Sequence, residues 1–150
     1  MDAALTFLSG SFNADIRISK GDLVREEDLE TAITLSLFSD RRAAADDPIE
    51  KGESLRGWWG DTFAEVKNDK FGSKLWLLRR EKQLQSVLDR AKQYAQESLQ
   101  WLIDDRVASK VLVITEIVGE KPSGILGIRI EVTRPTGLQT FQFDYVWNQI

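Results

Sequence analysis

The chain has 150 residues, which is the size of one domain. Of these residues 42% are hydrophobic and 29% are charged, a composition that is too apolar for intrinsic disorder. It contains no Cys and no His, which excludes disulfides, thiolate metal sites and the Ser-His-Asp and Cys-His arrangements of many enzymes. A net charge of -4 gives no basic field for nucleic acid, and no apolar run approaches the ~18 residues of a membrane span.

From these values we expect one soluble domain, residues 1–150, which binds neither nucleic acid nor membrane. The first residues lack the basic and apolar regions of a secretory signal, so we expect folding in a cytoplasm. The composition points to no cofactor.

The first part of the chain has a strand pattern followed by a helix pattern. Phe12–Ile18 is apolar at every second position, which predicts a half-buried strand, and Lys20-Gly21-Asp22 predicts a turn. Glu27–Phe38 predicts a helix of about three turns, with acidic residues in its first turn where the helix dipole favours them. Its apolar stripe contains Leu29, Ile33 and Leu37, with Ala32 and Leu35 beside it.

The middle of the chain is an irregular segment and then a long helical pattern. Asp40–Gly60 has no periodicity and is rich in Gly, Asp and mixed charges, which predicts an ordered surface loop. Apolar residues from Leu75 to Ile103 follow helical spacing, which predicts a long amphipathic helix with a break near Lys82. Ser73 is a candidate cap for that helix.

The last third changes to strand patterns. Lys110–Val118, Ile125–Val132 and Leu138–Trp147 predict three strands, joined by turns at Pro122-Ser123-Gly124 and Pro135-Thr136-Gly137. The order of these elements predicts an α+β fold: an N-terminal strand and two main helices packed on an antiparallel sheet with a C-terminal three-stranded meander.

The most unusual stretch is the loop segment from Arg56 to Asp61, in which Trp58 and Trp59 are adjacent and flanked by glycines. Neighbouring side chains on an extended segment point in opposite directions, so one indole can anchor the loop while the other meets a partner. The alternative is that both indoles are buried anchors of the loop.

Arginines next to Asp40 have two interpretations. Arg41 and Arg42 lie where the first helix should end, so they can complement its last carbonyls and its dipole. The functional alternative is that their guanidiniums pair with Asp61 or with carboxylates of a neighbouring subunit.

Acidic residues offer weak signs of catalysis or metal binding. A sugar-cleaving enzyme needs two carboxyls ~5–9.5 Å apart, and Asp61 with Glu81 is one candidate among the 24 acidic residues. The pairs Asp46-Asp47 and Asp104-Asp105 lack the spaced oxygen ligands of a calcium loop, so we interpret them as solvated and predict neither a catalytic residue nor a metal site.

Five blocks of sequence, taken in order, resemble the family of small baseplate proteins of Mu-like phages, the gene-forty-six products. The closing strands form the fifth block, and the other four are LETAITLSLFSDRRA (Leu29–Ala43), RGWWGD (Arg56–Asp61), GSKLWLLRREK (Gly72–Lys82) and YAQESLQWLIDDRVA (Tyr94–Ala108). Together they span nearly the whole chain. That family is in turn similar to the small baseplate wedge proteins of contractile tails, some of which have an old lysozyme label.

The resemblance implies a structural role in a virion tail baseplate. It implies several copies in six-fold arrangement around the tail hub, contacts with other wedge and hub proteins, and a first docking site for the tail sheath. The implied mechanism is strand addition at an open sheet edge, for which Lys110–Val118 or Leu138–Trp147 is long enough.

In detail the sequence departs from the wedge group at one motif. That group often has Glu-Pro-Arg between the long helix and the first strand, where this chain has Asp104-Asp105-Arg106, so only Arg106 is carried over. The expected partner-binding residues are Arg41, Arg42, Arg56, Trp58, Trp59, Asp61 and Arg106. Two other functions stay open: a tail-associated peptidoglycan hydrolase, and a regulatory adaptor that binds a host protein.

Overall fold

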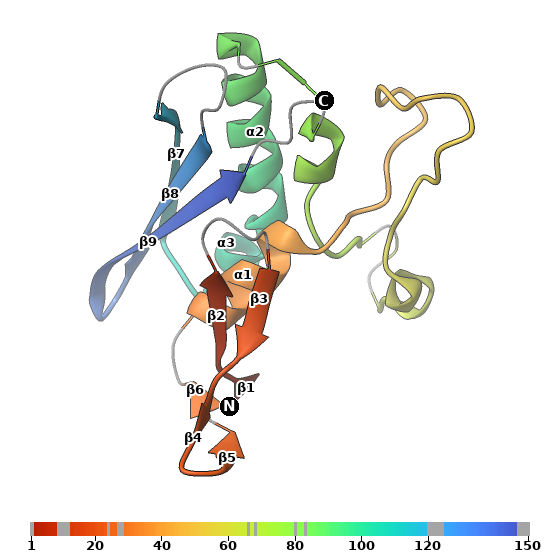
Figure 1. Ribbon diagram of the computed structural model, residues 1–150. Coiled ribbons are helices and arrows are strands. Elements are labelled where there is room, and N and C mark those ends of the chain that lie inside the picture. Colours follow the sequence, from red (N-terminus) through yellow and green to blue (C-terminus); the bar gives the residue numbers. More distant parts are fainter. Residues whose placement is uncertain are drawn as a thin grey trace.

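The computed structural model describes residues 2–8, 13–23, 25–26, 29–65, 67, 69–79, 81–82, 84–119 and 125–146. Its N-terminal strands form short antiparallel pairs that extend away from the body of the molecule (Figure 1). These pairs are β1 (Asp2–Ala3) with β6 (Arg25–Glu26), β2 (Leu5–Leu8) with β3 (Asn13–Ile16), and β4 (Ile18–Ser19) with β5 (Asp22–Leu23).

The strand predicted over Phe12–Ile18 is divided between β3 and the start of β4, and Phe12 itself lies outside the described residues. The predicted half-burial is wrong at its end, because Ile16 and Ile18 are exposed. The turn predicted at Lys20-Gly21-Asp22 is also confirmed. Lys20 and Gly21 have φ values of 52° and 80°, so the link between β4 and β5 uses the left-handed region that favours glycine.

The first predicted helix is α1 (Glu30–Phe38). Glu27, where the prediction began, lies outside the described residues. Ile33 and Leu37 are buried as the stripe predicts, but Leu35 is exposed. Leu35 therefore faces away from the core, toward the groove described below.

The long second helix is divided where a break was predicted, and its first part is not α-helical. Leu75–Leu78 forms a 3-10 turn, η2, after which Lys82 has no regular structure. α2 (Gln85–Ser98) and the single turn α3 (Trp101–Asp104) follow. Ser73 caps no α-helix: its hydroxyl donates to the Leu37 carbonyl and accepts the Leu75 N–H at 3.3 Å, which ties η2 to the end of α1.

The predicted C-terminal meander is confirmed: over the described residues the sheet order is β7-β8-β9, with all pairs antiparallel. The strands are β7 (Lys110–Val118), β8 (Ile125–Arg134) and β9 (Gly137–Val146). The predicted turn at Pro135-Thr136-Gly137 joins β8 to β9, whereas Pro122-Ser123-Gly124 and Trp147 lie outside the described residues.

Helices cover one face of this sheet, and the core lies between them (Figure 1). Ile128 and Ile130 of β8 are fully buried toward α2, and burial of each such side chain contributes roughly 1.5–3 kcal/mol. The Thr115 hydroxyl of β7 donates to the Leu88 carbonyl of α2 at 3.0 Å. Phe38 of α1 meets Phe143 of β9 edge to face with ring centroids 5.5 Å apart. The predicted α+β fold is confirmed.

Between α1 and η2 the chain makes a long excursion that begins and ends at one point. The Arg41 N–H donates to the Ser73 carbonyl, and the Ser73 N–H donates to the Ser39 carbonyl, both at 2.9 Å. Gly72 is required there, because its φ is 94° and a Cβ would lie 2.4 Å from the Ser39 oxygen. Within the described residues, no helix is long and apolar enough to cross a membrane.

Candidate protein-binding surfaces

The two adjacent indoles belong to an exposed aromatic cluster, which we define as Trp58, Trp59, Phe63 and Phe71. Trp58 lies 5.6 Å from Trp59 and 5.5 Å from Phe71 between ring centroids, and Trp59 lies 6.3 Å from Phe63. The exposed fractions are 48% for Trp58, 74% for Trp59 and 76% for Phe63. The interpretation that both indoles are buried anchors is wrong, because neither is buried in the core. Of the other interpretation, the exposed indole is confirmed as Trp59, whereas Trp58 packs on Phe71 and across Gly60 and not on the core.

The local backbone explains this arrangement. Residues Trp59–Phe63 form a 3-10 turn, η1, in place of an extended segment, so successive side chains do not alternate. The Trp58 indole lies across Gly60, where a Cβ would meet the ring at 2.2 Å. Gly60 thus makes the room that the indole occupies.

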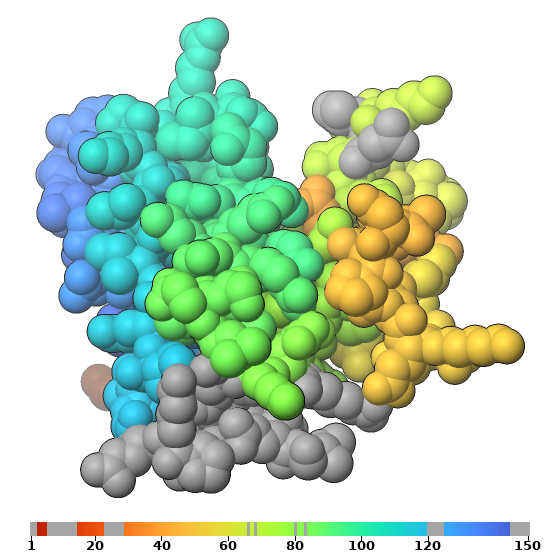
Figure 2. Space-filling model, turned by 90° about the horizontal axis from the view of Figure 1, so that it is seen from above, coloured from red at the N-terminus to blue at the C-terminus, as the bar shows by residue number. Residues whose placement is uncertain are grey.

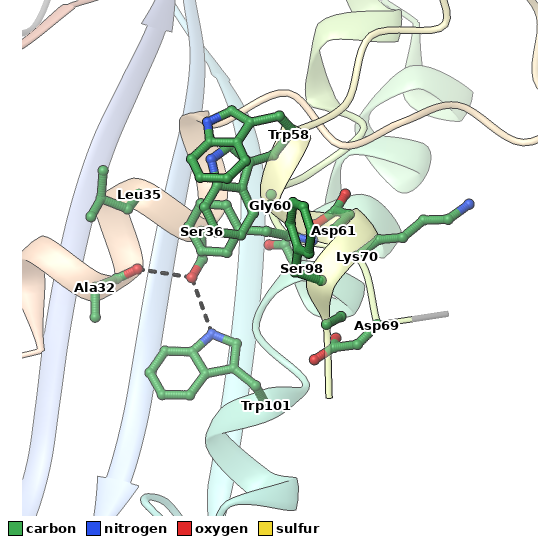
Figure 3. A pocket seen from close by; sticks show the side chains of 15 residues that line it. Ala32, Leu35, Ser36, Trp58, Gly60, Asp61, Asp69, Lys70, Ser98 and Trp101 are labelled. Atoms are coloured by element: carbon green, nitrogen blue, oxygen red, sulfur yellow. Dashed lines mark hydrogen bonds between the residues drawn. The ribbon is translucent and has the colours of Figure 1, made fainter. Parts of the chain in front are cut away.

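The aromatic cluster forms one wall of an open groove of about 660 Å³, which we call the aromatic groove. The opposite walls are α1, with Ala32, Leu35 and Ser36, and the junction of α2 and α3, with Ser98 and Trp101. Figure 2 shows the hollow between the green side chains of α2 and the yellow-green segment around residues 60–70. The side chains that line it are drawn in Figure 3.

Polar atoms at the base of the aromatic groove are hydrogen-bonded within the protein (Figure 3). The Ser36 hydroxyl donates to the Ala32 carbonyl at 2.8 Å and accepts the Trp101 indole N–H at 3.1 Å. The Ser98 hydroxyl donates to the Ala95 carbonyl at 2.8 Å. The groove therefore offers a partner mainly apolar surface.

Asp61 has a structural contact in this groove. Its carboxylate accepts the Phe71 N–H at 3.0 Å, which fixes the end of the loop next to η1. Within the described residues Asp61 forms no ion pair with Arg41 or Arg42, so the intramolecular pairing considered for these residues is wrong.

Arg56 forms an ion pair with Asp40 that was not predicted from the sequence. Its guanidinium lies 2.7 Å from the Asp40 carboxylate and 4.4 Å above the Trp76 ring centre, while the Trp76 indole N–H donates to the Arg41 carbonyl at 2.8 Å. The Arg42 guanidinium donates to the Arg56 carbonyl at 3.4 Å. Arg56 and Trp76 thus fasten the excursion to the body, and Arg41 and Arg42 reach the second groove described next.

A polar groove of about 680 Å³ continues from the aromatic groove and shares Asp69, Lys70, Ser98 and Trp101 with it. Arg41, Arg42 and Lys74 line its other side. The two hollows form one continuous surface that is apolar at one end and charged at the other.

Asp47 is not the solvated acid that the sequence indicated. Its carboxylate lies 2.9 Å from the Lys74 ammonium and accepts the Ala44 N–H at 2.6 Å. Both side chains are largely buried, with 11% of Asp47 and 19% of Lys74 exposed. Burial raises the pKa of Asp47, but the hydrogen bonds from Lys74 and Ala44 and the charge of Lys74 outweigh it, so the pKa is lowered.

The carboxyls considered as a catalytic pair lie in separate places. Asp61 lines the aromatic groove, whereas Glu81 lines a different hollow and pairs with Arg90 at 3.0 Å. Among the described residues, no group of three or more acidic side chains is placed to hold a metal ion. The structure therefore does not bring Asp61 and Glu81 together as a pair of carboxyls for sugar cleavage.

Arg106 has a backbone role. Its φ is 58°, and its N–H donates to the Ile103 carbonyl while the Ala108 N–H donates to the Leu102 carbonyl, at 3.0 and 2.9 Å. This left-handed residue ends α3 and turns the chain into β7. Its side chain is exposed and remains available for contact with a partner.

Open edges of the sheet form the second candidate surface. Among the described strands, β7 and β9 each pair with β8 alone. A groove of about 370 Å³ is lined by Glu30 and by five consecutive β9 residues, 139–143. Consecutive side chains of a strand point to opposite faces, so a hollow that touches all five follows the strand's edge.

Sequence reasoning identified the indoles but missed Leu35, Phe63, Phe71 and Trp101, which complete the aromatic groove. Leu35 and Trp101 follow the helical periodicity that also marks core residues, so their periodicity alone cannot separate groove from core. Phe63 and Phe71 could have been identified from the sequence, since both are aromatic residues in a polar segment close to the two tryptophans.

Comparisons with known proteins agree with the five blocks of sequence. Residues 29–139 match the family described as Phage protein GP46. Baseplate protein gp46 of Escherichia phage Mu is 35% identical over 151 residues, covering 99% of each chain. The Mu-like prophage FluMu protein gp46 of Haemophilus influenzae is 41% identical over 138 residues, covering 91% of this chain and 89% of the relative. The predicted resemblance is confirmed, and the chain belongs to the phage protein GP46 family.

Proposed function

We propose that the protein is a structural component of a phage-type tail baseplate, acting as a wedge protein without catalytic turnover. The relative from phage Mu is named as a baseplate protein and matches this chain from end to end, which supports the location and the role. In this proposal one domain links wedge subunits, joins the hub in a six-fold assembly and gives the contractile sheath its docking site.

The observation that carries the docking mechanism is the open edge of β9 with a groove beside it. A strand from the sheath or from a neighbouring tail protein adds to this edge through main-chain hydrogen bonds, because the N–H and C=O groups of an edge strand that face away from the sheet form a template for a further strand. Of the two edges, β9 is favoured because residues 139–143 line a hollow of strand length, bounded on its far side by Glu30 of α1.

Co-expression with the products of the two adjacent genes tests the role, with size-exclusion chromatography and light scattering as the readout. A complex of fixed stoichiometry is the expected result. A protein that stays alone contradicts the wedge role, and muralytic activity of the pure protein, lost on removal of one carboxylate, would support the hydrolase instead.

Proline substitutions at two neighbouring positions test the edge. The backbone N–H groups of an edge strand point alternately toward the neighbouring strand and away from the sheet. Of the two variants Gln139→Pro and Thr140→Pro, one therefore removes a hydrogen bond to β8, and the other removes only an N–H that points away from the sheet. We expect that variant to unfold near the wild-type temperature and to lose the docking partner. If the variant that keeps its stability also keeps the partner, docking does not use β9.

The loop residues form the second surface in this proposal. Trp58 and Trp59 contact a further baseplate protein, while Arg41 and Arg42 are available in the adjoining polar groove and Arg56 and Asp61 hold the loop in place. Arg106, which is exposed after α3, contacts a partner separately. Trp is enriched at interface hot spots, and an exposed pair of indoles provides a large rigid contact area.

A further inference from the structure

Exposed apolar side chains are concentrated in the aromatic groove. Over the described residues ten large hydrophobic side chains are exposed, and five of them line this one groove. The five are Leu35, Trp58, Trp59, Phe63 and Phe71. Scattered apolar side chains are normal on a protein surface, but a cluster of this kind marks an interaction site.

The walls of the aromatic groove determine what kind of segment fits. Two of its walls are helices, whose backbone N–H and C=O groups bond within α1 and α2, and its serine hydroxyls are already bonded. An extended peptide would find no ladder of main-chain partners there and would leave its own backbone unpaired against apolar surface. A helix bonds its own backbone internally, so a helix is the segment that suits this groove.

Charges at the polar end determine the sign of the partner. Among the described residues, Arg41, Arg42 and Lys70 form no ion pair, whereas Lys74 is paired with Asp47. Two acids of the polar groove, Glu97 and Asp104, accept hydrogen bonds from Gln93 and Gln100. These amide hydrogen bonds leave both carboxylates charged, and Asp69 adds a third negative charge, so the positive charge available to a partner is concentrated at Arg41 and Arg42.

We propose that the continuous groove receives an amphipathic helix of another baseplate protein. Apolar side chains at positions i, i+3 or i+4, and i+7 of that helix pack on Trp58, Trp59 and Phe63, and its acidic flank faces Arg41 and Arg42. The inference rests on the proposed function, because the helix comes from another tail protein. It is separate from strand addition at β9, which uses backbone groups of the sheet.

Photo-crosslinking within the assembled complex identifies the occupant. Phe63 is replaced by p-benzoylphenylalanine, an aromatic for an aromatic at a position that is 76% exposed, and the adduct is mapped by mass spectrometry after co-expression with the tail proteins. Ile18, which is 69% exposed and lies on the N-terminal strands outside the groove, is the matched control position. We expect the adduct from position 63 to map to an apolar and acidic helical segment of one tail protein, with no such adduct from position 18.

A synthetic peptide of the mapped segment then tests the chemistry. We expect far-ultraviolet circular dichroism to show a gain of helix on binding. Trp59→Ala should weaken binding about 30-fold, as at an interface hot spot, and Arg42→Glu about 10-fold at low salt. Ile18→Ala should change the affinity less than about 2-fold, as expected for a residue outside the interface.

Three results would overturn the inference while leaving the wedge role intact: an adduct with a second copy of this chain, an adduct with a segment that binds without helix formation, or a stable complex with no adduct from position 63. If the unmodified protein forms no complex with any tail protein, the proposed function itself is wrong. The two failures are therefore distinguishable.

Discussion

Replacing Asp47 by Asn removes the carboxylate that neutralises Lys74 while keeping an acceptor for the Ala44 N–H. Among the described residues the Lys74 ammonium would remain largely buried without an ion-pair partner, which costs about 2 kcal/mol for a pair that is not fully buried. A chain of 150 residues has an unfolding entropy of ~0.3 kcal/mol/K, so the melting temperature should fall by about 6 °C. Asp46→Asn is the control, because that neighbouring carboxylate is exposed.

Calorimetry at several pH values tests the same pair further. The pKa of Asp47 is lowered from 3.8, so its contribution to stability is complete above that value and is lost as pH falls through the lower folded value. The difference between wild type and Asp47→Asn should therefore be constant near neutral pH and shrink in acid. Equal shifts for the Asp46 and Asp47 variants at neutral pH, or a difference that does not change in acid, would refute this reasoning.

Three further substitutions have distinct expected results. Thr34→Val should raise the free energy of unfolding in urea by about 1 kcal/mol, because the buried Thr34 hydroxyl has no hydrogen-bond partner among the described residues. Ile128→Ala should lower it by roughly 2–5 kcal/mol in the same assay, since its fully buried side chain would leave a cavity. Gly60→Ala should leave unfolding nearly unchanged but abolish co-purification with the groove's partner, because the new Cβ displaces the Trp58 indole. An unchanged pull-down for this last variant would show that the position of Trp58 does not matter.

Local patterns were sufficient for the regular elements that lie on the core. The alternation from Ile125 to Val132 identified β8, because one face of a half-buried strand must be apolar at every second residue. The stripe of Ile33 and Leu37 identified α1 for the corresponding reason at helical spacing. The break near Lys82 was also visible, since the apolar spacing is interrupted there.

Contacts between distant segments were not predictable from such patterns. Leu75–Leu78 has helical apolar spacing, yet it forms a 3-10 turn, and Ser73 ties this turn to the end of α1. Asp47 resembled a solvated acid because its partner, Lys74, is 27 positions further along the chain. Arg56 likewise lies far in sequence from Asp40 and Trp76. Each of these side chains acquires its role only when the excursion closes.

That closure distinguishes sequence changes at the two ends of the excursion, which affect the folded body, from changes in its middle, which do not. Between Ser39 and Ser73 the backbone leaves the folded body and returns to its own starting point, so the body depends on the two ends of the excursion more than on its length. Insertions near the Gly52 turn, which lines neither the aromatic groove nor the polar groove, can lengthen the excursion without disturbing α1 or the sheet. Related chains can thus differ in the length of the excursion while keeping the same folding unit.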